Sequence, residues 1–295
     1  MPVDHQPLAG QVALVAGATR GGGRATAIEL ATAGATVYLT GRTTAASSSP
    51  MNRPETIEGT ASLVEAAGGN GIAVQVDHTD ADQVADLMAT IKAEHGRLDV
   101  LVNNVWGGDP MVEWDGPFWT HDLDNALALL RQAIDSHIIT SWHAAPLLTV
   151  DGGGLIIEVT DGTSTRYRGS FFYDLAKSSV IRLAVAQAAD FGDQGVAVVA
   201  VSPGFLRSEA MLDHFGVTEA SWRAAIKQDE HFAWSETPHY LGRAIVAIAA
   251  DTDRMALTGT TTATWELYQR YGFTDLDGSQ PDWGRHARED LGIEP

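Results

Sequence analysis

The sequence predicts one α/β domain built on a doubly wound parallel sheet of about seven strands, with helices on both faces and a C-terminal extension. Short apolar runs rich in β-branched residues alternate with longer segments of helical period along most of the 295 residues. A glycine-rich turn joins the first apolar run to the first helical segment. No Pro/Ser-rich linker divides the chain and no repeat is present, so residues 1–295 are expected to form a single domain.

Six apolar runs have the length and the Gly or polar boundaries of buried strands. They span residues 11–16, 36–40, 72–76, 98–102, 155–159 and 196–201. A segment rich in β-branched residues, 258–262, could add an edge strand. Because helical segments separate the runs, the strands are expected to be parallel.

The segments between the strands have the length and the small-apolar spacing of crossover helices. The predicted helices span residues 24–33, 81–95, 123–148, 172–191 and 239–250. Residues 43–54 are polar and rich in turn-forming residues, so we expect a loop there. After residue 262 the pattern loosens.

Composition excludes several classes of partner. A formal net charge of −19 opposes binding to nucleic acid phosphates, which draws on clustered Lys and Arg. No apolar run approaches a membrane span, and the N-terminus lacks a basic segment followed by a long apolar stretch. The absence of cysteine fits a reducing compartment, and no His/Asp/Glu spacing suggests a metal site. We therefore expect a cytoplasmic protein with a small-molecule ligand and no metal, nucleic acid or membrane partner.

The glycine-rich turn indicates an anion site. Gly17, Gly21 and Gly23 allow a tight turn, keep side chains away from an approaching phosphate and direct a helix N-terminus at it. Thr19 and Gly22 lie in the same turn. A pyrophosphate of a dinucleotide in a Rossmann-type fold is the functional interpretation, and a plain glycine-rich βα turn is the alternative.

The end of the second predicted strand bears on the choice of cofactor. Folds of this type that prefer NAD place an acidic residue there, whereas this chain has Arg42. Arg42 and Arg20, which lies inside the glycine turn, could bind a 2′-phosphate by charge-assisted hydrogen bonds. The sequence therefore favours NADP over NAD, although either arginine could be an ordinary solvated side chain.

Tyr173 and Lys177 form a Y-x-x-x-K pair. Residues four apart on a helix share a face, so the phenol and the ammonium can meet one ligand side by side. The spacing also occurs by chance in many helices. Downstream of a dinucleotide-type turn, the pair indicates hydride chemistry.

These motifs occur in an order that resembles the short-chain dehydrogenase/reductase family over nearly the whole chain. The order is the glycine turn, Asp77, the Asn103–Gly107 segment, Tyr173 with Lys177, and Pro203-Gly204. The segments 235–237, 257–259 and 270–278 are similar to the subgroup represented by mammalian dehydrogenase/reductase member one. The resemblance implies an NADP-dependent oxidoreductase acting on a carbonyl or alcohol, assembled as a homodimer or homotetramer.

The resemblance also implies roles for the tyrosine and lysine. Tyr173 would be the proton donor in carbonyl reduction. Lys177 would lower the pKa of the tyrosine from about 10 and hold the nicotinamide ribose.

Further cofactor contacts follow from the same resemblance. Asp77 would approach the adenine and His78 would supply a backbone contact. Asn104 and Gly107 would line the cofactor channel. Asn103 would support the sheet. The nicotinamide would be bordered by the three residues Pro203, Gly204 and Ser208, with Ser208 bonding the carboxamide.

The end of the fifth strand departs from the family, which usually has a Ser-Ser pair whose hydroxyl binds the substrate carbonyl. This chain has Thr160-Asp161. Thr160 or Ser164 could supply the hydroxyl, whereas an ionised Asp161 would repel a developing oxyanion. Asp161 could remain protonated, bind an amine or polyol group, or form a turn with the following glycine.

The fourth helix contains a second departure. Ala133 stands where the family usually has an Asn that joins a proton relay to the lysine. A rearranged water chain or His137 could compensate. Helix packing is the alternative role for His137 and for His143.

Aromatic residues surround the expected substrate site. Four aromatic residues follow the fourth strand: Trp106, Trp114, Phe118 and Trp119. They could bind an apolar ring of the substrate or pack the loop against the core. Residues 205–235 correspond to the family's substrate lid. Residues 265–295 replace a short tail and could pack on the body, on another subunit or over the pocket.

Two other classes of function remain open at this stage. The departures at Ala133 and Asp161 motivate a cofactor-binding regulator with little turnover. An enzyme that uses Asp161 as a charge partner, for imine reduction or non-redox chemistry, is the other alternative.

Overall fold

The computed structural model describes residues 6–47, 49 and 51–295. Within them, seven strands form one parallel sheet in the order β3-β2-β1-β4-β5-β6-β7. The strands are β1 (Val12–Ala16), β2 (Thr36–Gly41), β3 (Asn70–Gln75), β4 (Val100–Asn103), β5 (Leu155–Val159), β6 (Ala197–Ser202) and β7 (Thr261–Ala263). The predicted doubly wound fold is confirmed.

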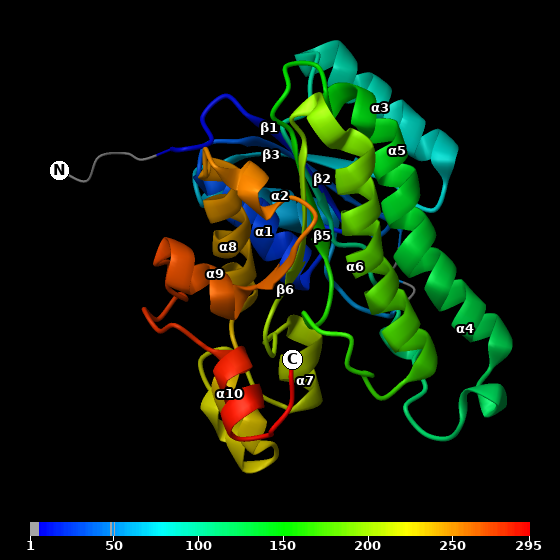
Figure 1. The fold of residues 1–295 in the computed structure, drawn as a ribbon, viewed down its shortest axis with the longest axis vertical. Helices are drawn as coiled ribbons and strands as arrows, with labels where there is room; N and C mark the ends of the chain where they lie inside the picture. Colours follow the sequence, from blue (N-terminus) through cyan, green and yellow to red (C-terminus); the bar gives the residue numbers. More distant parts are fainter. Residues whose placement is uncertain (1–5, 48, 50) are drawn as a thin grey trace.

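Helices cover both faces of the sheet (Figure 1). The α-helices are α1 (Gly21–Thr32), α2 (Ile57–Ala66), α3 (Ala81–His95), α4 (Leu123–Leu130), α5 (Ser136–Leu148), α6 (Phe171–Phe191), α7 (Glu209–His214), α8 (Pro238–Ala250), α9 (Thr264–Tyr271) and α10 (Trp283–Glu289). Because successive strand residues point to opposite faces, Val15 and Ile157 pack with α1 and α8, whereas Leu14 and Ile156 pack with α3, α5 and α6.

The element boundaries lie close to those expected from the sequence. Strand β5 and helix α3 have the predicted bounds, and the other five early strands differ by at most two residues. Strand β7 forms at the sheet edge, beside β6, as expected. Helix α2 was not predicted. Of the expected loop 43–54, residues 48 and 50 lie outside the described residues, as do residues 1–5 of the N-terminus, and the rest contains no helix or strand.

The predicted single helix over residues 123–148 is wrong in one respect. A π-helical turn, Arg131–Asp135, separates α4 from α5, and the buried Ala133 lies within it. The hydroxyl of Ser136 donates to the carbonyl of Gln132 over 2.5 Å, and the Gln132 amide donates to the carbonyl of Trp106. A π turn adds one residue to the helix and is frequent at functional sites.

A buried polar network ties β4, β5 and α5 together below the carboxyl edge of the sheet. The amide of Asn103 donates to Glu158 and to Ser141, both over 2.9 Å. Nδ1 of His137 lies 2.6 Å from the other Glu158 oxygen, and its Nε2 lies 3.2 Å from the carbonyl of Val105. Both ring nitrogens of His137 thus have partners within the core, which favours the packing role over the relay role.

No helix in the described part of the chain combines the length and the apolar character needed to cross a membrane.

Removal of the Glu158 carboxylate is expected to destabilise the fold strongly. Glu158→Ala leaves Asn103 and His137 without their acceptor in a fully buried position, so the free energy of unfolding should fall by about 3 kcal/mol or more. Urea unfolding followed by circular dichroism measures the change. Glu65→Ala, at an exposed carboxylate of α2, is the control and should cost less than about 0.5 kcal/mol. Equal losses in the two variants would contradict the buried network.

Candidate active site

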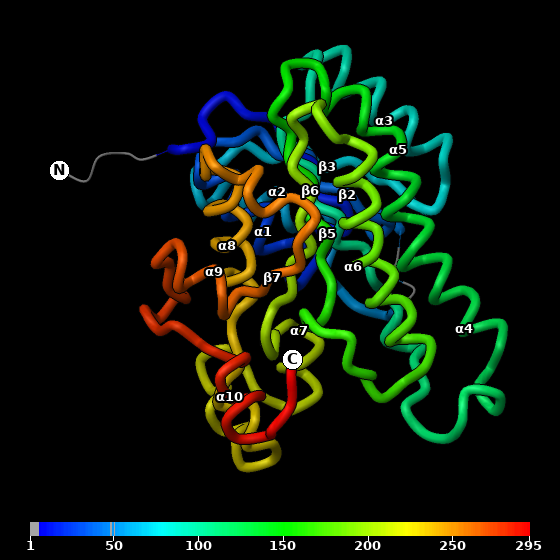
Figure 2. Tube along the Cα trace, in the orientation of Figure 1, coloured from blue at the N-terminus to red at the C-terminus, as the bar shows by residue number. Residues whose placement is uncertain are grey.

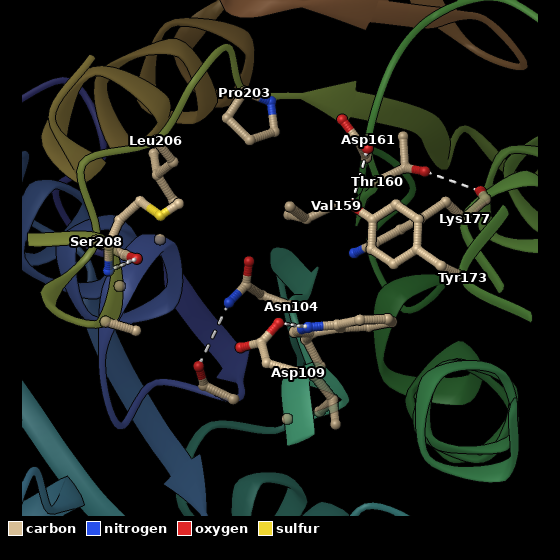
Figure 3. A pocket seen from close by; sticks show the side chains of 18 of the residues that line it. Asn104, Asp109, Val159, Thr160, Asp161, Tyr173, Lys177, Pro203, Leu206 and Ser208 are labelled. Carbon is tan, nitrogen blue, oxygen red and sulfur yellow. Dashed lines mark hydrogen bonds between the residues drawn. The ribbon is translucent and has the colours of Figure 1, made fainter. Parts of the chain in front are cut away.

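A cavity of about 1180 Å³ lies beyond the carboxyl ends of the strands. It spans the switch point between β1 and β4, where the strand order reverses and where ligands of doubly wound sheets bind. The turn after β1, the ends of β4 and β5, the start of α6 and the segment after β6 all contribute to its wall. Figure 3 shows part of this wall, with Asn104 facing Ser208 across the cavity and Tyr173 beside Asp161.

The turn between β1 and α1 is shaped by glycine. Gly17 has a φ of +85°, and a Cβ added to Gly23 would lie 2.1 Å from the carbonyl oxygen of Gly17. Gly21 and Gly22 line the cavity directly, whereas Gly23 packs the helix against the strand. The turn therefore leaves open backbone at the N-terminus of α1, which fits a pyrophosphate.

An acidic side chain from α7 occupies this anion position. The amide of Gly21 donates to Oε2 of Glu209 over 2.8 Å, and Arg24 lies 3.2 Å from the other oxygen. Sequence analysis missed Glu209, although it directly follows Ser208. Its carboxylate and a cofactor phosphate would compete for the same helix N-terminus.

Both arginines expected near the 2′-phosphate line the cavity. Arg42 donates to the side chain of Gln132 over 3.0 Å, and it also lies 3.8 Å from the Asp77 carboxylate. Arg20 contacts the sulfur of Met51, and burial lowers the pKa of its guanidinium. Two cations are thus available at this end of the cavity.

Sequence analysis did not identify Arg53, a third arginine in the same wall. It forms hydrogen bonds with Glu55 and lies 2.9 Å from Asp213 of α7. The bond to Glu55 raises the pKa of the guanidinium. It lies inside the polar segment 43–54, which the sequence indicated only as a loop.

Tyr173 and Lys177 lie on the first turns of α6 and face the cavity together. The phenol donates to Oδ2 of Asp161 over 2.8 Å. Nζ of Lys177 lies 4.1 Å from the ring centre of Trp106, in a cation–π contact. The structure thus brings together a phenol, a carboxylate and an ammonium.

The surroundings of this pair shift both pKa values. Burial, followed by the charge of Asp161, raises the pKa of Tyr173 well above its usual value. Burial lowers the pKa of Lys177. The direction for Tyr173 is opposite to the one expected from the sequence, because burial and the carboxylate beside the phenol both disfavour the phenolate.

The two hydroxyls considered as carbonyl-binding groups are engaged elsewhere. The buried Thr160 donates to the backbone carbonyl of Lys177 over 2.8 Å. Ser164 donates to the carbonyl of Glu294 over 3.1 Å. Asp161, rather than Thr160, is the residue that meets Tyr173, and Figure 3 shows the Thr160 hydroxyl directed away from the phenol.

Arg168 supports Asp161, and sequence analysis missed it. Its Nε donates to the backbone carbonyl of Asp161 over 2.6 Å and lies 4.0 Å from the carboxylate. Its Nη1 donates to Asp174 over 2.9 Å. The side chain is 9% exposed, so it fixes the segment between β5 and α6 from within.

The remaining predicted cofactor residues lie around the same cavity. Those that line it are Thr19, Asp77, His78, Asn104, Gly107, Pro203, Gly204 and Ser208. The His78 ring lies in the core between Thr40 and Thr140, and burial lowers its pKa to about 4. The Ser208 side chain caps α7 by accepting from the amide of Met211.

The aromatic residues divide into two groups. Trp106 and Trp114 flank Tyr173, with ring centres 5.4 and 5.1 Å from it. Phe118 stacks on Phe171 outside the cavity wall, and Trp119 is 73% exposed. Only the first group borders the candidate reaction centre.

Two late segments complete the cavity wall. Phe205, from the segment that follows β6, and Trp283 of α10 line it and contact each other edge to face. The carbonyl of Pro295 accepts hydrogen bonds from the amide and hydroxyl of Thr163, two residues after Asp161. Figure 2 shows α10 beside the segment after β6, in agreement with the Phe205–Trp283 contact.

Among the described residues, no group of three or more His, Cys, Asp or Glu side chains has the arrangement of a metal site.

The doubly wound sheet with a glycine turn beside its cavity defines a dinucleotide-binding type of fold, and comparison with known proteins identifies the family. The family model for short chain dehydrogenase matches residues 11–215. This chain belongs to the short-chain dehydrogenase/reductase family and is an NAD(P)-dependent oxidoreductase.

Several relatives show the range of the family. Human dehydrogenase/reductase SDR family member 1 is 31% identical over 92% of this chain and 85% of its own length, which confirms the predicted subgroup. The 7alpha-hydroxysteroid dehydrogenase of Escherichia coli is 26% identical over 70% of this chain and 76% of its own. A short-chain dehydrogenase/reductase from Serratia marcescens superposes with a TM-score of 0.71, at 27% identity, over 87% of this chain and 97% of that one.

Substitution of Glu209 is expected to strengthen cofactor binding. Glu209→Gln keeps an oxygen near the Gly21 amide but removes the charge that competes with a phosphate, so the Kd for NADPH should fall about two- to fivefold. Titration of NADPH fluorescence measures it. An unchanged or higher Kd would show that Glu209 and the cofactor do not compete.

Proposed function

We propose that this protein transfers hydride between NADPH and a carbonyl or alcohol substrate, with Tyr173 as proton donor and Lys177 as its partner. The observation that carries the proposal is the shared cavity. The glycine turn, where the Gly21 amide donates to Glu209, lies at one part of its wall, and the Tyr173–Lys177 pair lies at another. A bound nicotinamide supplies the hydride.

The cavity wall offers a place for each part of the cofactor. The turn from Gly17 to Gly22 would hold the pyrophosphate, and Asp77 would lie near the adenine. Pro203 and Gly204 would border the nicotinamide, and Lys177 would hold the ribose beside it.

Tyr173 is suited to give a proton rather than to take one. Because burial and Asp161 raise its pKa, the phenol keeps its proton through neutral pH and can donate it to an alkoxide formed during reduction. Lys177 places a positive charge beside the same ligand.

The preference for NADP rests on Arg20 and Arg42, which supply two cations at the end of the cavity near Asp77. Asp77 neutralises part of the Arg42 charge, so Arg20 would contribute more of the attraction for a 2′-phosphate. A 2′-phosphate would form charge-assisted hydrogen bonds with both guanidinium groups.

Larger features of the chain fit the same proposal. Residues 205–235 would form a lid over the cavity, and residues 265–295 would form an extension that covers it. The enzyme would consist of one domain and would be cytoplasmic. Exposed apolar side chains on α4, α5 and α6 support a homodimer or homotetramer through these helices; they are Leu123, Leu127, Ile138, Trp142, Phe171 and Leu175.

One observation favours a second candidate function. The buried Ala133 cannot take part in the side-chain relay that its position serves in the family. A cofactor-binding regulator with little turnover would bind NADPH but oxidise it slowly.

Loss of either cofactor arginine is expected to weaken NADPH specifically. Arg20→Ala and Arg42→Ala should each raise the Kd for NADPH about tenfold or more and leave that for NADH nearly unchanged, because NADH lacks the 2′-phosphate. Parallel fluorescence titrations measure both constants. Arg182→Ala, at an exposed arginine of α6, is the control. Equal losses for both cofactors would contradict the assignment.

Tyr173→Phe is expected to abolish carbonyl reduction. The variant keeps the ring between Trp106 and Trp114 but loses the proton donor, so kcat/KM for ketones and aldehydes should fall about 100-fold or more. NADPH oxidation at 340 nm measures the rate, and fluorescence titration checks that the cofactor still binds. Oxidation at the unchanged rate would exclude Tyr173 as donor, and tight binding without turnover in the parent protein would favour the regulator.

A further inference from the structure

Asp161 gives the reaction centre a carboxylate where a hydroxyl would suit a neutral carbonyl. Oδ2 of Asp161 accepts the proton of the Tyr173 phenol over 2.8 Å. The Asp161 side chain is 45% exposed, so it faces the cavity rather than the core. A carboxylate here can accept a hydrogen bond or pair with a cation, but it repels a developing alkoxide.

Aromatic faces stand next to this carboxylate. Trp106 and Trp114 lie on two sides of Tyr173, and all three line the cavity. The Trp106 indole donates to Oδ1 of Asp109 over 2.6 Å, which adds a second carboxylate to the wall. Indole faces combined with carboxylates are the usual chemistry of sites that bind organic cations.

The charges around Tyr173 include cations that are already paired. Arg168 lies 2.9 Å from Asp174 and donates to the Asp161 backbone. The Lys177 ammonium lies over Trp106, and burial lowers its pKa. Arg166 also lines the cavity, with an exposed side chain. The Asp161 carboxylate accepts from Tyr173, lies 4.0 Å from Arg168 and acts electrostatically on Lys177, yet 45% of the side chain stays exposed and can meet a ligand.

We propose that Asp161 is the specificity-determining residue of this site, and that it selects cationic C=N substrates, iminium ions with an apolar ring, over neutral ketones. This inference rests on the proposed hydride transfer from NADPH. The ring would lie against Trp106 and Trp114, and the iminium nitrogen would lie beside the Asp161 carboxylate.

The chemistry balances without a proton donor. The iminium carbon gains the hydride, the π electron pair of the C=N bond moves to nitrogen, and NADPH becomes NADP⁺. The positive charge leaves the substrate as the bond forms, so the product is a neutral amine. An N-alkylated iminium needs no proton from Tyr173, whereas a ketone does.

The test compares two bicyclic probes of similar size, the permanently charged N-methyl-3,4-dihydroisoquinolinium and the neutral 1-tetralone. The full-length parent chain should reduce the iminium with a higher kcat/KM, after subtraction of the reaction of NADPH without enzyme. Asp161→Asn should lower kcat/KM for the iminium about tenfold to a hundredfold, since it removes a charge-assisted contact. The same variant should improve reduction of 1-tetralone, because the charge that repels a developing alkoxide is gone.

Two further variants complete the design. Tyr173→Phe should lose 1-tetralone reduction but retain iminium reduction, which a merely structural role of the pair would not produce. Asp193→Asn, at an exposed carboxylate of the segment after α6, controls for the loss of one charge from the acidic chain. Binding of N,N-dimethyl-tetrahydroisoquinolinium, a charged analogue that cannot be reduced, should quench tryptophan fluorescence in the parent and weaken in Asp161→Asn.

The outcomes separate this inference from the function on which it rests. Tyr173-dependent reduction of 1-tetralone with no iminium turnover would overturn the inference and leave the proposed function intact. Equal losses for both probes in Asp161→Asn would also overturn it. Binding of NADPH without reduction of either probe would overturn both proposals.

Discussion

The close approach of the β1–α1 turn to the edge of the sheet is the constraint on which the site depends. A Cβ on Gly23 would lie 2.1 Å from the Gly17 carbonyl oxygen, and one on Gly17 would lie 2.8 Å from that of Asn104. Only glycine lets α1 start this near to β1 and β4. Because all strands are parallel, the ends of β5 and β6 and the start of α6 reach the same edge. The anion-binding turn and the Tyr173–Lys177 pair therefore share one cavity.

Asp161 changes the electrostatics of an otherwise familiar arrangement. A hydroxyl could both accept from Tyr173 and donate to a substrate, whereas an ionised carboxylate can only accept. The phenol keeps its proton, and the negative charge faces a wall that contains two indoles. Arg168 holds the backbone of this segment, so the carboxylate is positioned by the fold rather than by a flexible loop. A protonated phenol and a half-exposed carboxylate thus lie side by side in one cavity.

The sequence predicted most strands well because their apolar runs are buried on both faces, although β3 is only partly buried and began two residues earlier than expected. The motif residues line one cavity because most of them follow the carboxyl ends of parallel strands. The sequence could not predict what depends on three-dimensional packing. The π turn around Ala133 adds one residue to a helix without altering its apolar pattern. The distance in sequence to Tyr173 could not show whether Thr160 or Asp161 would contact the phenol. The answer depends on the path of the backbone after β5. Glu209 and Arg168 act across the fold and carry no local signal.

The most direct test of hydride transfer uses NADPH carrying deuterium at both C4 positions, with mass spectrometry of the reduced substrate. If the nicotinamide and the Tyr173–Lys177 pair meet one substrate in this cavity, deuterium should appear at the carbon that was unsaturated, and the solvent should supply none there. A reduced product without deuterium, or no reduced product from any carbonyl or iminium probe, would contradict the account.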